Sequence, residues 1–408
     1  MTLQSSSFAE FDIRAKAGAV LNVVFFGASL TWGANSSDPQ LTSYRGNIAR
    51  CLEAEYPQAH FKFSDASIGG TTSQLGAFRF ERDVLGRHPD LVFLDFSLND
   101  GMYSDDPETM ASYESLVRRC ILDAHAPVVQ VIFPSKGMAE QGHTRDMRRR
   151  DAHLAISKAY NTAIGDAIVH IQEHLRLGRA TAEELWPFDP DNTHPGDSGY
   201  ALYAEAAWRG FKDAVRSEIV CAAPLKVLYA ETYLKPLRMS LSTFSPLPFG
   251  WQTGSPNTTS AHYDMLMSRW FDSEVIVNNS GKGHAGTLTA DFIGSTVMVF
   301  GESTLQSGSF RVLIDRREAG RAAVDKLIDA AGSAGYVGGN AHLVAVLATN
   351  LDPNRIHRIE IVPILVGNQE LRLESLCIAG PGARLELAAV KAISVPTRRR
   401  FDGRLLKA

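Results

Sequence analysis

The stretch LNVVFFGASLTWG, residues 21–33, decides the fold of the first half of the chain. It opens with six residues that are apolar except for Asn22, and it continues into Gly27, Ala28 and Ser29. A short apolar run that ends at glycine is typical of a buried strand in a parallel sheet. In open α/β sheets the reactive groups lie at the carboxyl ends of the strands. Ser29 therefore stands where a nucleophile is expected, although an ordinary strand-to-helix turn would have a similar sequence.

The segments that follow alternate between expected strands and expected helices. Strands are predicted at residues 61–67, 91–96 and 128–133, with a short fifth strand at 167–171. Apolar residues at helical spacing separate these strands, as in the helix that Pro107 opens. This alternation predicts a parallel α/β sheet with right-handed crossovers. The polar segment 136–150, with its run of arginines, is interpreted as a solvated basic loop or helix start rather than a flexible loop beside the active face.

Polar residues follow three of these strands and fill one later loop. The second strand leads into Gly69-Gly70-Thr71, and the third leads into Ser97-Leu98-Asn99-Asp100. Prolines at 187, 190 and 195 force an irregular loop that contains Asp191 and His194, with Asp197 or Ser198 as the expected cap of the next helix. Together with Ser29, these residues include the groups that acyl transfer requires: a nucleophile, a base with a carboxylate, and N–H donors.

Each of these polar groups has a place in that chemistry. The hydroxyl of Ser29 needs a base, and His194 can supply one because imidazole titrates near neutral pH. Asp191, three residues earlier, can orient the imidazole. The backbone N–H groups of Ser29 and Gly70 and the side-chain amide of Asn99 are the expected oxyanion donors.

The same four segments resemble the sequence blocks of the SGNH hydrolase (GDSL esterase/lipase) superfamily. They are FGASLT at 26–31, IGGT at 68–71, SLND at 97–100 and DNTH at 191–194, in the family's order within about the first 215 residues. The chain has Ala28 where the family has aspartate, and Ser97 where it usually has glycine. Neither change removes a catalytic group.

The resemblance implies a flavodoxin-like three-layer α/β/α fold and ester hydrolysis without a cofactor. By position, Ser29 would be the nucleophile, and Asp191 and His194 would complete the triad. Ser29, Gly70 and Asn99 would form the oxyanion hole. Trp32, three residues after the nucleophile, is expected to border the substrate. No metal site is predicted, because Asp191, His194 and Asp197 offer too few ligands.

Composition limits the remaining possibilities. The chain has 408 residues with 45% hydrophobic and 21% charged residues, which suggests a globular protein of two domains. A formal net charge of -4 gives no support for a nucleic-acid or membrane-surface partner. The four cysteines are far apart, and neither a signal peptide nor a long apolar run is evident, which favours a cytoplasmic location. Composition leaves room for a homo-oligomer.

The pattern of apolar residues changes near Pro224. Short β-rich runs are predicted at 275–277, 288–292, 297–300, 310–314, 343–348, 359–365 and 371–378. Such runs predict a β-sandwich or jelly roll. The expected domains are therefore residues 1–222 and 223–390, followed by a basic tail, 391–408. Trp251, Trp270 and Phe271 could stack on a sugar, but burial in a core or between domains is favoured.

These features predict a serine esterase that removes acetyl or other short acyl groups from a carbohydrate. An appended sandwich and the lack of a long apolar lid favour a polar substrate over a lipid. Two alternatives remain: a lysophospholipase or thioesterase, and a glycan-binding protein that keeps the hydrolase scaffold without turnover.

Overall fold

The computed structural model describes residues 6–257, 271, 273–279, 285–316, 322–332, 334–337 and 339–387. The predicted basic tail and Trp270 lie outside these residues. Within them the first half of the chain forms a five-stranded parallel sheet with the order β2-β1-β3-β4-β5. Its strands are β1 (Val20–Gly27), β2 (His60–Ser67), β3 (Leu91–Leu94), β4 (Val128–Ile132) and β5 (Ala163–Asp166).

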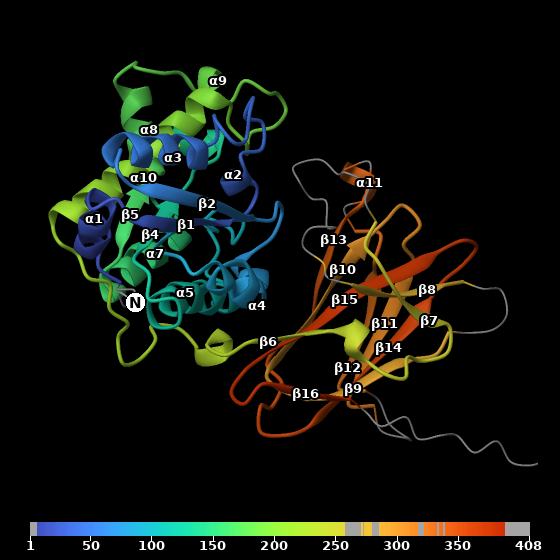
Figure 1. Cartoon of the computed structure of the whole chain (residues 1–408). Coiled ribbons are helices and arrows are strands. Elements are labelled where there is room, and N and C mark those ends of the chain that lie inside the picture. The colour runs from blue at the N-terminus through green and yellow to red at the C-terminus, as the bar shows by residue number, and fades with distance from the viewer. Residues whose placement is uncertain are drawn as a thin grey trace, which may run out of the picture.

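Helices cover both faces of this sheet. They are α1 (Phe8–Lys16), α2 (Ser29–Trp32), α3 (Tyr44–Glu55), α4 (Ser73–Asp83), α5 (Pro107–Leu122), α6 (Lys136–Glu140), α7 (Arg148–Tyr160), α8 (Ala167–Arg176), α9 (Ala182–Leu185) and α10 (Asp197–Arg216). Helices α3 and α10 lie over one face, and α4 and α5 lie over the other (Figure 1). This layering and strand order confirm the flavodoxin-like α/β/α fold. We call elements α1 to α10 the α/β domain.

The fifth strand was predicted at the wrong residues. Residues 167–171 belong to α8, and the strand is 163–166 instead. The Asp166 side chain accepts a hydrogen bond from Val169 N at 3.3 Å and caps that helix. The helix before this strand, α7, ends at Tyr160, and its cap residue Asn161 is left-handed with φ 50°. An apolar run too short to show its period cannot separate these two assignments.

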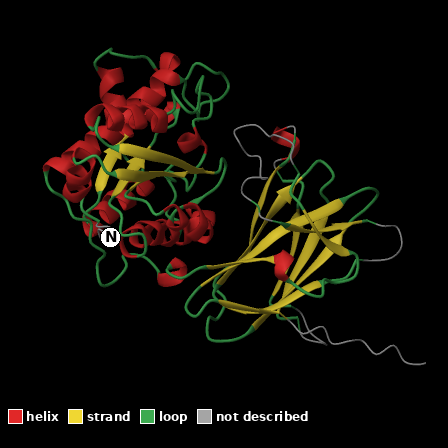
Figure 2. Ribbon diagram, viewed as in Figure 1, coloured by secondary structure: helices red, strands yellow, loops and turns green. Residues whose placement is uncertain are grey.

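The second half of the chain contains two antiparallel sheets and little helix (Figure 2). One sheet has the order β13-β10-β15-β8-β7, with β6 also paired to β15, and the other has the order β12-β11-β14-β9-β16. The strands are β6 (Leu237–Ser240), β7 (Trp251–Gly254), β8 (Glu274–Asn278), β9 (Leu288–Ile293), β10 (Thr296–Ser303), β11 (Ser309–Ile314), β12 (Val324–Asp329), β13 (Ala341–Ala348), β14 (His357–Ile364), β15 (Glu370–Ala379) and β16 (Arg384–Leu387), with a short helix, α11 (Ala334–Val337). We call elements β6 to β16 the β domain.

The second all-β region that the sequence predicted is therefore present, and every predicted run overlaps a strand. Strands β6, β7, β12 and β16 were not predicted. Strand β12 carries mostly exposed residues, so it lacks the apolar alternation on which the prediction depended. The boundary near residue 222 remains a prediction. No helix among the described residues combines the length and the apolar character that a membrane span requires.

Candidate active site

The nucleophile turn begins where β1 ends. Ser29 is the first residue of α2, and only 5% of its surface is exposed. Gly27 has no room for a side chain, because an added Cβ would lie 2.1 Å from Thr31 Oγ1 and 2.5 Å from the carbonyl oxygen of Asp95. Glycine therefore lets the chain turn tightly from strand to helix and holds Ser29 at the carboxyl edge of the sheet.

The structure brings Ser29, His194 and Asp191 together. His194 Nε2 lies 2.8 Å from Ser29 Oγ, and His194 Nδ1 lies 2.7 Å from Asp191 Oδ2. Ser29 and His194 are 165 positions apart in the sequence, so the contact depends on the tertiary fold. A serine, an imidazole and a carboxylate in such a series form an activated nucleophile.

Backbone contacts hold the loop that carries Asp191 and His194. Gly196 N donates to the carbonyl of Leu185 at 2.9 Å, and Lys136 N donates to the carbonyl of Asn192 at 2.8 Å. Asp197 does not cap α10 as predicted; the cap residue is Gly196, without a side-chain bond. The Asp197 carboxylate instead accepts from the backbone N–H and the hydroxyl of Ser37, at 2.8 and 2.6 Å, which ties the loop to the segment after α2.

The Asp191 carboxylate faces several N–H donors. Oδ1 accepts from Thr193 N at 2.9 Å and from His194 N at 3.1 Å. Oδ2 accepts from Asn35 Nδ2 at 3.0 Å as well as facing the imidazole. Sequence reasoning missed Asn35, which lies in a polar loop with no motif to single it out. These donors fix the carboxylate in the orientation that holds His194.

The three expected oxyanion donors follow neighbouring strands of the sheet. Ser29, Gly70 and Asn99 follow β1, β2 and β3, which are neighbours in the parallel sheet, so all three lie at one edge. Gly70 has φ 71°, a left-handed conformation that glycine adopts without strain. Among the described residues, no acceptor is found for the N–H groups of Ser29 and Gly70 or for the Asn99 amide. Such donors are available to a negatively charged oxygen.

Comparisons with known proteins agree with this arrangement. Residues 25–202 match the GDSL-like Lipase/Acylhydrolase family. An acetylxylan esterase of Geobacillus stearothermophilus is 25% identical over 214 residues, which is 48% of this chain and 95% of the relative. This chain is accordingly a carboxylic ester hydrolase.

A solved structure resembles both domains of this chain. It is a two-domain esterase active on acetylated mannans, co-crystallised with mannopentaose, at 25% identity and a TM-score of 0.71. The alignment covers 92% of this chain and 95% of that one. A second crystal structure, of a two-domain esterase active on acetylated mannans, aligns at 24% identity with a TM-score of 0.72 and shows the same fold.

The Asp100 side chain links the segment after β3 to the start of α4. Its buried carboxylate accepts a hydrogen bond from Ser73 N at 2.9 Å, at the start of the helix that follows Gly70. Burial raises the pKa of Asp100 to about 7, against the hydrogen bond from Ser73, which lowers it. Arg149 lies nearby with its side chain buried, so the prediction of a solvated basic segment is wrong at this residue.

This raised pKa predicts a pH dependence of stability. Between pH 4 and 7 the unfolded chain releases the Asp100 proton while the folded chain keeps it, so stability falls as pH rises through this window. In Asp100→Asn the amide oxygen still accepts from Ser73 N and no longer titrates. We expect the free energy of unfolding of the variant, relative to the wild type, to rise by on the order of 2 kcal/mol from pH 4 to pH 7. Urea unfolding at several pH values measures this difference, and a constant difference would contradict the prediction.

The aromatic residues considered for substrate binding differ in their burial. Trp32 is half-buried at the end of α2, and its carbonyl accepts from Arg45 Nη2 at 3.1 Å; its role in substrate binding remains a prediction. Trp251 is 7% exposed and Phe271 is 5% exposed. Trp251 lies in the core of the sandwich, and Phe271 packs on Phe300 with ring centroids 4.8 Å apart. Both are buried as favoured, and neither offers a ring to a sugar.

A group that could hold a metal ion lies elsewhere in the described part of the α/β domain. Ligand atoms of His170, His174 and Glu205 lie within 4.8 Å of one another on α8 and α10. Arg209 Nη2 is 3.1 Å from His170 Nδ1, so a guanidinium cation already lies against this group and opposes a metal cation. The residues around Ser29 require no metal for the chemistry described below.

Proposed function

We propose that this chain is a serine esterase that removes acetyl groups from a carbohydrate through an acyl-enzyme intermediate. The observation that carries the proposal is the unbroken series of hydrogen bonds from Asp191 through His194 to Ser29, with contacts of 2.7 and 2.8 Å. A hydroxyl in that position loses its proton to the imidazole as it attacks an ester carbonyl.

The remaining steps follow from the same groups. The attacked carbonyl oxygen becomes negative and receives hydrogen bonds from the N–H groups of Ser29 and Gly70 and from the Asn99 amide. As the tetrahedral intermediate collapses, His194 gives its proton to the leaving sugar hydroxyl and acetyl-Ser29 remains. Water then attacks the acetyl carbonyl while His194 takes a proton from it, and acetate and free Ser29 result.

The substrate class is taken from the relatives. One is named an acetylxylan esterase and the other is a two-domain esterase active on acetylated mannans. The aligned β domain extends the likeness over 92% of this chain, which supports a carbohydrate rather than a lipid as the alcohol partner.

A substrate panel tests the proposal. Pure protein is assayed with acetylated xylo- and manno-oligosaccharides, a long-chain lysophospholipid and an acyl thioester. We expect release of acetate from an oligosaccharide and little turnover of the other two. If only the lipid or only the thioester is hydrolysed, the proposed carbohydrate substrate is wrong. Failure of a fluorophosphonate to label Ser29 would favour a glycan-binding protein without turnover.

Asn99→Ala tests the proposed oxyanion hole. Loss of one donor to the developing charge is expected to lower kcat by about 10²- to 10³-fold with little change in KM. Asn22→Ala is the matched control, because Asn22 lies near the start of β1, at the opposite end of the strand from Ser29. Steady-state kinetics on an acetyl ester measures both variants, and equal kcat values for Asn99→Ala and the wild type would remove Asn99 from the oxyanion hole.

Several features are proposed on the sequence alone. They are the cytoplasmic location and the domain limits 1–222 and 223–390, with a basic tail at 391–408.

A further inference from the structure

One buried arginine contacts the strand ends that lead into the active site. Arg79 belongs to α4 and is 1% exposed. Its Nη2 donates to the carbonyl of Gly27 at 2.8 Å, and its Nη1 donates to the carbonyl of Ala66 at 2.7 Å. Gly27 is the last residue of β1, and Ala66 is the last but one of β2. A single guanidinium group therefore joins the ends of the two parallel strands that lead to Ser29 and Gly70.

The same guanidinium group packs on two aromatic rings near these strand ends. Its Cζ lies 4.5 Å from the ring centroid of Phe26 in β1 and 5.8 Å from that of Phe96. Phe96 follows β3 in the chain and comes shortly before Asn99. The two rings meet edge to face, with centroids 5.4 Å apart. Because cations are attracted to aromatic rings at such distances, Arg79 contacts the ends of all three strands that precede the expected oxyanion donors.

The contacts of Arg79 must balance the burial of its charge. Burial lowers the pKa of Arg79 to about 10, against the nearby Asp83, which raises it, so the side chain is charged at pH 7. Asp83 Oδ2 lies 3.1 Å from Arg79 Nη1, one turn further along α4. An apolar side chain would fill the same place without any charge to desolvate. What the arginine adds is its pair of hydrogen bonds to the strand carbonyls.

The hydrogen bond to Gly27 bears on the direction of the Ser29 N–H group. Only Ala28 separates the two residues, so a rotation of the peptide after Gly27 would turn the N–H of the serine as well. The Gly27 carbonyl accepts from Ile68 N at 3.2 Å in addition to Arg79 Nη2. These two donors hold the plane of that peptide from different sides of the turn.

The hydrogen bond to Ala66 bears on the Gly70 turn in the same way. Strand β2 lies at the edge of the described parallel sheet and pairs there with β1 alone, so its end has few backbone partners. Within the turn, Thr71 Oγ1 donates to the carbonyl of Ile68 at 2.7 Å. A glycine rotates more freely than other residues, and a restraint on the segment before it limits the directions of its N–H group. Arg79 supplies such a restraint at Ala66.

Helix α4, which carries Arg79, is held in turn by the linker between the domains. Gln74 Nε2 donates to Tyr233 Oη at 2.9 Å, and Tyr233 Oη donates to Glu108 Oε2 at 2.6 Å. Thr296 Oγ1, at the start of β10, donates to the same carboxylate oxygen at 3.2 Å. The first turn of α4 is thereby connected to α5, to the linker and to the first residue of a strand in the β domain.

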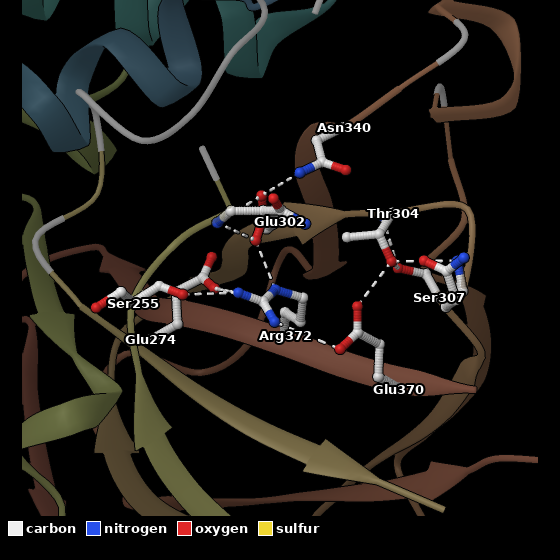
Figure 3. A network of polar contacts seen from close by, with 10 residues as sticks. Ser255, Glu274, Glu302, Thr304, Ser307, Asn340, Glu370 and Arg372 are labelled. Atoms are coloured by element: carbon white, nitrogen blue, oxygen red, sulfur yellow. Dashed lines mark hydrogen bonds and ion pairs between the residues drawn. The ribbon is translucent and has the colours of Figure 1, made fainter. Parts of the chain in front are cut away.

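A buried polar network fixes that strand within the β domain (Figure 3). Glu302 of β10 accepts from Asn340 Nδ2 at 2.9 Å, and its Oε2 lies 2.5 Å from Arg372 Nε on β15. Arg372 Nη2 lies 3.0 Å from Glu274 Oε2 on β8. These contacts join three neighbouring strands, so the β domain offers α4 a firm neighbour rather than a loose one.

We propose that Arg79 is a positioning residue for the oxyanion hole, which holds the ends of β1 and β2 so that the N–H groups of Ser29 and Gly70 face the developing negative charge before the substrate arrives. The proposal rests on the proposed function, because it takes both N–H groups as oxyanion donors. Such preorganisation stabilises the transition state more than the bound ester. Its loss should therefore lower kcat and leave KM nearly unchanged.

The test compares substitutions of Arg79 with a substitution of a similar buried arginine. Arg79→Met removes both donors to the carbonyls, and Arg79→Lys keeps the charge beside Asp83 without the planar fork that spans two acceptors. Arg119→Met is the matched control. Arg119 is 5% exposed, its Nη1 donates to the carbonyl of Ala77 at 3.0 Å, and its Cζ lies 4.4 Å from the ring centroid of Phe80. It makes contacts of the same kinds, but with α4 instead of with strand ends.

Full-length proteins are assayed with 4-nitrophenyl acetate, an ester too small to need a glycan-binding surface. Circular dichroism and thermal melting establish that each variant is folded at the assay temperature. The rate of fluorophosphonate labelling at Ser29 and the inhibition constant of phenylboronic acid are measured beside kcat and KM. A boronic acid forms a tetrahedral adduct with an active serine, so its binding reports on the oxyanion hole, whereas a loss of stability alone would change only the melting temperature.

We expect Arg79→Met to lower kcat, the labelling rate and the affinity for the boronic acid by about 10- to 100-fold, with KM within about twofold, since the oxyanion donors are loosened rather than removed. Arg79→Lys should lose about tenfold in the same quantities while it melts closer to the wild type. Arg119→Met should lower the melting temperature and leave kcat within about twofold.

A folded Arg79→Met protein with the kcat and boronic-acid affinity of the wild type would overturn the proposal, as would an equal loss of kcat in Arg119→Met. If Arg79→Met does not fold, Arg79→Lys decides in its place, and a wild-type kcat in that variant has the same consequence. If the wild type itself is not labelled at Ser29, the proposed function fails instead, so the two failures are distinguishable.

Discussion

Ser29→Ala is expected to lower kcat for an acetyl ester by about 10⁵-fold or more, because the attacking oxygen is lost and only binding and the oxyanion donors remain. The fold should be retained, since the serine hydroxyl is hydrogen-bonded to His194 and the substitution removes one small group. His194→Ala should cost a similar factor. Acetate release by pure variants, with thermal melting as a check on folding, measures both effects.

Two further proteins make this test specific. The double variant Ser29→Ala/His194→Ala should lose no more activity than either single variant, because the two groups act as one unit. Ser36→Ala is the matched control: its hydroxyl contacts the carbonyl of Gly33 in the neighbouring turn, and activity within about threefold of the wild type is expected. Substantial hydrolysis by Ser29→Ala would exclude the mechanism.

The α/β domain was predictable because its signals are local. The first and third strands that lead into the site are apolar runs, and the second alternates apolar and polar residues. Each strand ends at glycine or at polar residues, so the pattern lies within about ten residues of sequence. The contact between Ser29 and His194 was expected only because four such segments occurred in the order of a known family. No local pattern predicts a contact across 165 positions.

The wrong predictions also arise because a local sequence pattern does not contain the deciding contact. Residues 167–171 are apolar enough for either a strand or a helix, and the choice depends on the cap at Asp166. Arg149 was expected in solvent because arginine is rarely buried, yet its Nη2 donates to the carbonyl of Asp100 and to Thr109 Oγ1, at 3.2 and 2.6 Å. The acceptors that make its burial tolerable come from another strand end and another helix.

The β domain shows most clearly what a local sequence pattern cannot predict. Its strands were predictable from alternating apolar residues, but β10 is buried on both faces, and the sequence does not say what covers the second face. The structure shows that the cover is the α/β domain.

Asp191→Asn is the second variant with a large expected effect, and the contacts of the carboxylate explain why so small a change matters. Oδ1 accepts from two backbone N–H groups, and Oδ2 accepts from Asn35 and faces His194 Nδ1. An asparagine has one oxygen and one amide nitrogen, so either orientation places its N–H₂ against a donor. With the amide nitrogen toward His194, Nδ1 must become the acceptor and the ring proton moves to Nε2. A protonated Nε2 can no longer take the proton of Ser29.

We therefore expect Asp191→Asn to lower kcat by about 10³- to 10⁴-fold with a small change in KM. Asn35→Ala is the control, because it removes one donor to Oδ2 and leaves the carboxylate in place; a loss of about tenfold or less is expected. Rates are compared for an ester with a good leaving group and for an acetylated sugar, since both need His194 as base in the first step. If Asp191→Asn stays within tenfold of the wild type, Asp191 does not orient the base, and another group must hold the imidazole.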